Sequence, residues 1–262
     1  MRHTLHAEWT KLRTLPSNAW LALAVVVFIV GASVAATLTV DTSNCPSPRE
    51  CFEDTTKLSL TGVWLGQVAV IVLAVGMVAG EYGTGLIHLT LAAQPRRHTV
   101  LLTKATVLTA TVAVAGTLGV LGAVAGGRII LPGNGFTAAN GYPPLSLADP
   151  STLRASVGTV LYLMLIALLS LGIATAVRET ATALTTTLAL LLITPSLTAL
   201  VSDPEWHARL AKLSPMTAGL AIQATTRLDH LPIAPWAGLG VLAAWAAAAL
   251  LLGTTVLVRR DQ

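Results

Sequence analysis

GEYGTGLIHLTLAAQPRRHTVLLTK, residues 80–104, is the stretch around which the rest of this chain is organised. It lies between two long apolar segments and combines one acidic residue, Glu81, with three glycines, a proline and a compact basic group. Gly83 and Gly85 permit the backbone to bend where the preceding apolar segment ends. Everything else in the sequence is either a long apolar segment or a short connection.

The composition indicates an integral membrane protein. Hydrophobic residues make up 54% of the 262 residues, charged residues only 11%, and the mean hydropathy is +0.73. A soluble domain carries about 25% charged residues. The net charge of +4 does not point to nucleic acid, because the basic residues stand at the ends of apolar segments and not along one face.

Six charge-free apolar windows are each about 20 residues long, which is the length a helix needs to cross the hydrocarbon core of a bilayer. They are residues 19–40, 60–80, 105–126, 157–177, 181–201 and 236–258. Backbone polar groups in lipid must be satisfied internally, and the alternating pattern of a barrel is absent, so the windows predict helices. The expected fold is one all-α transmembrane domain over residues 1–262.

The charges predict an orientation with both termini in the cytoplasm. The inner segments of this topology hold nine Lys and Arg against four Asp and Glu, and the outer segments hold seven against eight. Cys45 and Cys51, the only cysteines, then lie in the first outer loop, where the oxidising compartment favours a disulfide. Two free thiols are the alternative.

The amino-terminal segment, residues 1–16, predicts a short helix in the headgroup region. Leu5, Trp9 and Leu12 recur at helical spacing, while the polar residues fall mostly on other faces. A frayed tail is the alternative. Trp9 and Trp20 would mark the inner membrane interface, and Trp64 and Trp236 the outer one.

The stretch 80–104 itself predicts a helix on the membrane surface. Leu86, Leu89 and Leu91 would hold this helix against the bilayer, and Pro95 would end it. Basic side chains after the proline are expected to face phosphate headgroups or an acidic partner: Arg96, Arg97 and Lys104. A solvated loop with a routine basic flank is the alternative.

Small residues spaced four apart predict close helix packing. The pairs are Gly62 with Gly66, Gly76 with Gly80, and Gly122 with Gly126. The polar candidates for a transport pathway are Gln67, Thr186 and Thr187, although threonines in membrane helices more often bond their own backbone or a neighbouring helix. Between residues 202 and 235, Trp206, Leu210, Leu213, Leu220 and Ile222 predict short amphipathic helices that dip into the outer leaflet.

The sequence GEYGTGLIHLTLAAQPRRHTVLLTKA resembles the first cytoplasmic loop of ABC exporter permeases of the second type. In that family a Glu at the end of the second helix precedes a Gly-Thr-hydrophobic run, a Pro-Arg pair and a Lys that opens the third helix. HAEWTKLRTLPSNAW, residues 6–20, resembles the amino-terminal segment of bacterial members, especially actinobacterial-looking ones.

The resemblance implies a permease half with six transmembrane helices that pairs with a second permease subunit, identical or different. It also implies a separate ATP-binding subunit, and export of a lipophilic or amphipathic compound such as a drug, antibiotic, peptide or lipid. Residues 1–16 would be the interfacial helix, and residues 81–97 a cytoplasmic coupling helix that docks on the ATPase. The implied coupling residues are Glu81, Tyr82, Gly83, Thr84, Gly85, Leu86, Pro95, Arg96 and Arg97.

The chain carries no G-x-x-x-x-G-K-[ST] phosphate loop, so ATP and Mg²⁺ are expected on the partner subunit. No catalytic or metal-binding pattern is present, and we expect a transport subunit in the bacterial plasma membrane, in contact with lipids, and not an enzyme. An ion-coupled carrier is one alternative, although the apolar windows hold no ionisable acid or base. A membrane scaffold that transports nothing is the other.

Overall fold

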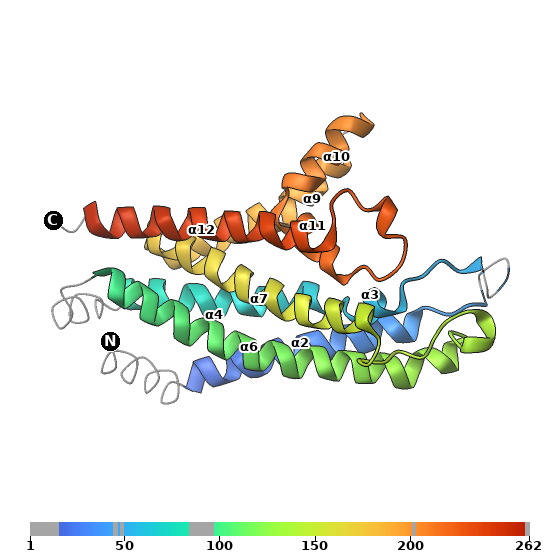
Figure 1. Cartoon of the computed structure of the whole chain (residues 1–262). Helices are drawn as coiled ribbons and strands as arrows, with labels where there is room; N and C mark the ends of the chain where they lie inside the picture. Colours follow the sequence, from blue (N-terminus) through green and yellow to red (C-terminus); the bar gives the residue numbers. More distant parts are fainter. Residues whose placement is uncertain (1–15, 44–46, 48–49, 84–96, 201–202, 260–262) are drawn as a thin grey trace.

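The computed structural model describes residues 16–43, 47, 50–83, 97–200 and 203–259. Every regular element in this part of the chain is helical, which confirms the predicted class. Five of its helices are long and apolar enough to cross a membrane, and they pack side by side as a bundle (Figure 1). These helices are α2 (Pro16–Thr39), α4 (Val63–Gly83), α6 (Arg97–Ile130), α7 (Pro150–Val177) and α12 (Pro235–Arg259).

The bundle has two ends that we name by what they contain. The junction end is where α4 ends at Gly83 and α6 begins at Arg97; α2 also begins there, and α7 and α12 end there (Figure 1). The opposite end, called the α3 end, carries the short helix α3 (Thr55–Ser59) and the 3₁₀ turns η2 (Leu131–Asn134) and η3 (Ala138–Asn140). Since α12 begins at the α3 end, the chain between α7 and α12 returns along the bundle.

The predicted span 181–201 consists of three helical pieces. They are α8 (Thr180–Leu188), the π-helical turn η4 (Ala189–Ile193) and α9 (Thr194–Ala199). Pro195 explains the interruption, because proline lacks an N–H and its ring collides with the preceding turn, which a wider π turn accommodates. The apolar helix here, Thr180–Ser196, is shorter than the other five, so a sixth span stays a prediction.

Helix α6 is longer than its predicted span of residues 105–126. Its 34 residues extend over about 50 Å at about 1.5 Å per residue, more than the hydrocarbon thickness of about 30 Å. Lys104 and Arg128 therefore lie within the helix, near the two ends of its charge-free part.

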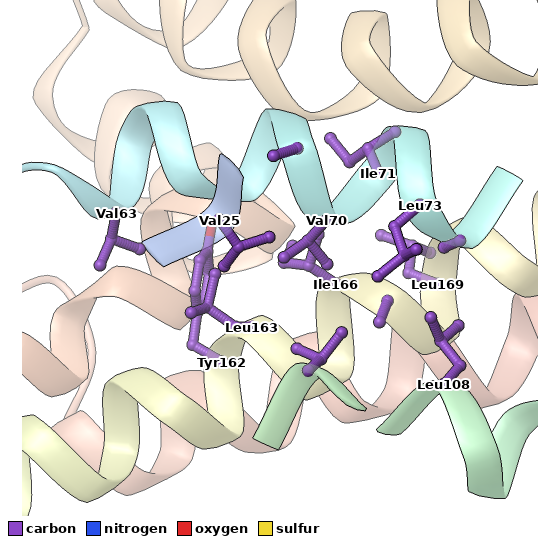
Figure 2. Packing of buried hydrophobic residues seen from close by; sticks show 14 of the residues in the cluster. Val25, Val63, Val70, Ile71, Leu73, Leu108, Tyr162, Leu163, Ile166 and Leu169 are labelled. Atoms are coloured by element: carbon purple, nitrogen blue, oxygen red, sulfur yellow. The ribbon is translucent and has the colours of Figure 1, made fainter. Parts of the chain in front are cut away.

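Helix α4 is the central helix of the bundle. Within its most apolar window 67% of the residues are buried, against 22% for α2 and 28% for α12. It packs on α2, α7 and α8. Figure 2 shows Val70 and Leu73 of α4 pointing toward Ile166 and Leu169 of α7, while Ile71 points to the other side of α4.

Close packing at small residues is confirmed for two of the three glycine pairs. A Cβ at Gly66 would lie 2.9 Å from Cδ1 of Ile29 on α2, and one at Gly126 would lie 2.9 Å from Cγ2 of Val34 on the same helix. The third pair, Gly76 and Gly80, has no neighbour within 4 Å among the described residues. In the part of the chain that the structure describes, the first and last pairs bring helices together and the third pair does not.

The segment before α12 has an exposed part and a buried part. On α10 (Pro204–Leu213) the side chains of Trp206, Leu210 and Leu213 are exposed, as an amphipathic surface helix requires. The same expectation was wrong for Leu220 and Ile222. These two residues, on α11 (Pro215–Leu220) and η5 (Ala221–Gln223), are buried inside the bundle.

Candidate functional site

The structure describes only part of the predicted coupling residues, and this part lies at the junction end. Glu81 and Gly83 lie in the last turn of α4 and Arg97 is the first residue of α6, without described side chains; Tyr82 is half-buried. The remaining ones lie outside the described residues: Thr84, Gly85, Leu86, Pro95 and Arg96. The predicted interfacial residues Leu5, Trp9 and Leu12 lie outside them as well.

Arg178 joins three helices at the junction end. It ends α7 in the left-handed conformation, with φ of 66°. Its guanidinium carbon lies 5.2 Å from the centroid of the Tyr82 ring on α4, within cation–π range, and its Nη2 donates a hydrogen bond of 3.2 Å to the carbonyl of Val256 on α12. One side chain thus contacts the ends of α4 and α12 while its backbone closes α7.

Lys104 corrects an expectation from the sequence. It was expected to face headgroups or an acidic partner, but it is 2% exposed, and its Nζ donates a hydrogen bond of 3.2 Å to the carbonyl of Met77 on α4. The long apolar stem of lysine packs readily among apolar neighbours, so the residue can lie between helices. Lys104 connects α6 to α4 inside the bundle.

Glu179 begins the next helix directly after Arg178. Its Oε1 accepts a hydrogen bond of 2.9 Å from the N–H of Ala181, and its Oε2 accepts one of 2.6 Å from the N–H of Thr182. Hydrogen bonds from Thr182 and then Ala181 hold the pKa of Glu179 below its ordinary value. Only Arg178 and Glu179 therefore separate the end of α7 from the start of α8.

An uncharged polar cluster lies inside the bundle. The hydroxyl of Tyr162 on α7 donates a hydrogen bond of 2.5 Å to Oε1 of Gln67 on α4, and Nε2 of Gln67 lies 3.7 Å from the sulfur of Met216 on α11. Nearby along α7, Thr159 Oγ1 accepts a hydrogen bond of 3.2 Å from Nε2 of Gln223. Figure 2 shows Tyr162 among the apolar core residues. We call Gln67, Thr159 and Tyr162 the polar cluster.

The three predicted pathway residues have different surroundings. Gln67 is fully buried, so it lines no open passage in this state. Thr187 is buried and donates a hydrogen bond of 2.8 Å to the carbonyl of Ala183, one turn earlier. It therefore bonds to the backbone of its own helix, as threonines in membrane helices often do. Thr186 is exposed on the surface of α8. Only Gln67 belongs to an inter-helix polar contact.

At the α3 end, one carboxylate connects two segments that are far apart in sequence. Asp54 Oδ1 accepts hydrogen bonds from the N–H of Lys57 (3.0 Å) and the hydroxyl of Thr225 (2.7 Å). Its Oδ2 accepts hydrogen bonds from the N–H groups of Thr225 (2.5 Å) and Thr226 (3.1 Å). Arg154 adds a hydrogen bond of 2.5 Å from its Nη2 to the carbonyl of Ala224.

A cavity of about 470 Å³ lies beside this carboxylate, lined by residues from 51–56, 140–152 and 225–227. The guanidinium carbon of Arg227 lies 3.9 Å from the centroid of the Phe52 ring at its rim. Partial burial and then the charge of Glu53 raise the pKa of Tyr142. Cys51 also lines the cavity, but Cys45 lies outside the described residues, so the disulfide stays a prediction.

No group of three or more His, Cys, Asp or Glu that could hold a metal ion occurs among the described residues. Sequence reasoning missed Asp54, Tyr162 and Arg178. Tyr162 had a visible signal, since it is the only tyrosine in any of the six apolar windows. Asp54 and Arg178 carried no such signal, because the partners that give them their roles are more than 70 residues away in the sequence.

No protein-family model matches this chain, and no curated protein matches it.

Proposed function

We propose that this chain is the permease subunit of an ATP-driven exporter in the bacterial plasma membrane. It moves a lipophilic or amphipathic compound outward, and a separate subunit binds ATP and Mg²⁺. The resemblance of residues 80–104 to the coupling loop of exporter permeases supports this function, together with the chain's lack of a phosphate loop. A second permease subunit, identical or different, completes the pathway.

The observation that carries the proposal is the connection between the helices at the junction end. Residues 84–96 join α4 to α6. Lys104 of α6 also bonds to α4, and Arg178 connects α4 to α7 and α12. A partner that pushes on residues 84–96 therefore acts on helices that are already connected to the rest of the bundle. Close-packed interiors transmit such displacements because they cannot deform freely.

The mechanism follows from this arrangement. ATP binding draws the partner subunits together and moves residues 81–97, which we call the coupling segment. The ends of α4 and α6 move with it, and the Tyr82–Arg178 contact passes the movement to α7 and α12. Rocking of these helices opens the pathway toward the outer side. The two arrangements of the bundle are the two states whose balance the ATPase shifts.

A site-specific photo-crosslinker tests the coupling role. We would place p-benzoylphenylalanine at His88, in the coupling segment, and at His207, on α10, as the matched control. The proposal predicts that the His88 position forms an adduct in native membranes with one protein that carries a phosphate-binding loop, and that the His207 position does not. Adducts with lipids alone at His88, or the same adducts at both positions, would contradict it.

A further inference from the structure

Helix α11 and the turn η5 occupy an unusual place for such short elements. All nine residues from Pro215 to Gln223 except Thr217 are buried. Ile222 packs against Gly158, where even a Cβ would collide with it, and Gly219 lies against the Tyr162 ring. Irregular backbone inside a membrane protein is tolerated where protein covers it. We call residues 215–226 the lid, because they close the bundle beside α7 and α12.

The groups that the lid contacts are polar but carry no charge. They are the amide of Gln67 and the hydroxyl of Thr159. The Tyr162 ring lies against Gly219 while its hydroxyl bonds to Gln67, and all three residues are fully buried. In the lid, the thioether of Met216 lies beside the amide of Gln67, and the amide of Gln223 donates a hydrogen bond to the hydroxyl of Thr159. Without the lid the N–H groups of Gln67 need another hydrogen-bond partner, since an unpaired buried polar group is costly, and the Thr159 hydroxyl loses the hydrogen bond from Gln223.

A charged ligand would be a poor replacement for the lid. The polar cluster offers neither an acid nor a base to pair with, and an unpaired charge at this depth is expensive. A ligand with amide or hydroxyl groups between apolar portions would repeat what Met216, Ile222 and Gln223 provide. The lid thus has the chemistry that a suitable cargo would have.

The lid is held from the α3 end. Asp54 accepts three hydrogen bonds from Thr225 and Thr226, and Arg154 donates one to Ala224. Hydrogen bonds to a charged group are stronger than neutral ones, and removal of one partner leaves several donors unsatisfied. Asp54 comes from the segment before α3, more than 170 residues earlier in the chain, so it holds the lid without being part of it.

We propose that the polar cluster is a binding site for an uncharged, amide- or hydroxyl-bearing cargo, that the lid fills this site in the present state, and that Asp54 keeps the lid closed. This inference rests on the proposed function, which gives the site a cargo to move. Its experiments use the chain alone, without the ATPase subunit.

Thiol accessibility tests the closed lid. The full chain carrying Thr159→Cys is placed in lipid nanodiscs, which expose both faces, and intact-mass spectrometry follows its reaction with the charged reagent 2-sulfonatoethyl methanethiosulfonate. Wild type gives the background from the native cysteines. Adding Asp54→Asn should accelerate the reaction at least tenfold. Asparagine caps a helix as well as aspartate does, so α3 is kept.

Asp203 is the matched control, because its carboxylate also caps a short helix, α10, but holds no part of the lid. Asp203→Asn should leave the rate unchanged. Thr225→Val, which removes one hydroxyl and keeps the backbone N–H, should accelerate the reaction less than Asp54→Asn. Equal rates for Asp54→Asn and Asp203→Asn, with both proteins folded, would overturn the role of Asp54.

Ligand protection tests the class of cargo. In the Asp54→Asn, Thr159→Cys protein, millimolar N-acetyl-leucyl-phenylalaninamide should slow the thiol reaction at least threefold, and the corresponding free acid should not. Gln67→Leu should abolish the protection. No protection by the amide, or equal protection by amide and acid, would overturn the site. An absent ATPase partner would instead contradict the proposed function and leave these rates unchanged.

Discussion

At the scale of residues, some glycines in this chain lie against a neighbouring helix and others lie in open space, so replacing them tests how the helices pack. A Cβ at Gly172 on α7 would lie 2.5 Å from the backbone carbon of Ala249 on α12, whereas one at Gly76 on α4 would meet nothing within 4 Å. Gly172→Ala must therefore push two backbones apart, and we expect it to cost about 1–3 kcal/mol of stability. Gly76→Ala should be neutral or stabilise by up to about 1 kcal/mol.

Unfolding in detergent micelles, followed by tryptophan fluorescence, measures both variants under identical conditions. The described helices carry tryptophans such as Trp20, Trp64 and Trp245 as probes. If both substitutions shifted the unfolding midpoint equally, the close approach of α7 and α12 would be wrong.

The Gln67–Tyr162 hydrogen bond gives a second prediction at this scale. Tyr162→Phe keeps the ring against Gly219 but removes the hydroxyl, and Gln67→Leu removes the amide. Each single variant leaves a buried partner unsatisfied, and the double variant leaves neither, so the effects should couple by about 0.5–1.5 kcal/mol. The same unfolding assay provides the cycle. Strictly additive effects would show that the two side chains do not depend on each other.

Lys104 shows what sequence can and cannot predict about single residues. Its charge marks the boundary of an apolar window, which the sequence shows directly. Whether it faces outward or lies under a neighbouring helix depends on the position of Met77, and that is set by how α4 and α6 pack. Gln67 was singled out as a rare polar residue, but its partners come from segments 95 and 149 residues away.

At the scale of elements, the cap of α8 predicts a dependence on pH. Its hydrogen bonds hold the pKa of Glu179 below the ordinary value of 4.5. A depressed carboxylate pKa means that the cap stabilises the folded state above pH 4.5 and that this contribution is lost as the pH falls through the folded pKa. Glu179→Ala should therefore lower the melting temperature at pH 7, by less and less below pH 4.5.

Thermal melts of wild type and Glu179→Ala at several pH values measure this effect. Glu205→Ala, at an exposed acid that caps no helix, is the control. A difference between wild type and Glu179→Ala that stayed constant from pH 7 to pH 3 would contradict a cap that depends on the ionised carboxylate.

The elements that sequence predicted best are those specified by their own composition. The five long helices follow from windows of uninterrupted apolar residues. The boundaries of α6 were missed, because a helix continues beyond the bilayer wherever its backbone finds partners. The burial of α11 was missed because the segment 215–223 is short and mixes apolar with polar residues. It was missed also because Gly158, which leaves room for Ile222, lies about 60 residues earlier in the chain.

At the scale of the whole molecule, orientation is predicted from the charges alone. With more Lys and Arg at the junction end, carboxyl-terminal fusions should give a fluorescent green fluorescent protein and an inactive alkaline phosphatase in a bacterial host. Alkaline phosphatase fused after Asn140, at the α3 end, should be active. The opposite pattern at both positions would show that the topology is inverted. The coupling segment would then lie on the side of the membrane where no ATP is available.

The central claim is that a separate ATPase drives this chain through residues 81–97. The most direct measurement is purification of the tagged full chain from its native membranes in mild detergent, with quantitative mass spectrometry of what accompanies it and assay of ATP hydrolysis. We predict a stoichiometric subunit with a phosphate-binding loop, active as an ATPase and lost when Arg96 and Arg97 are both replaced by Glu. A well-expressed chain that purified alone, or only with copies of itself, would contradict the account.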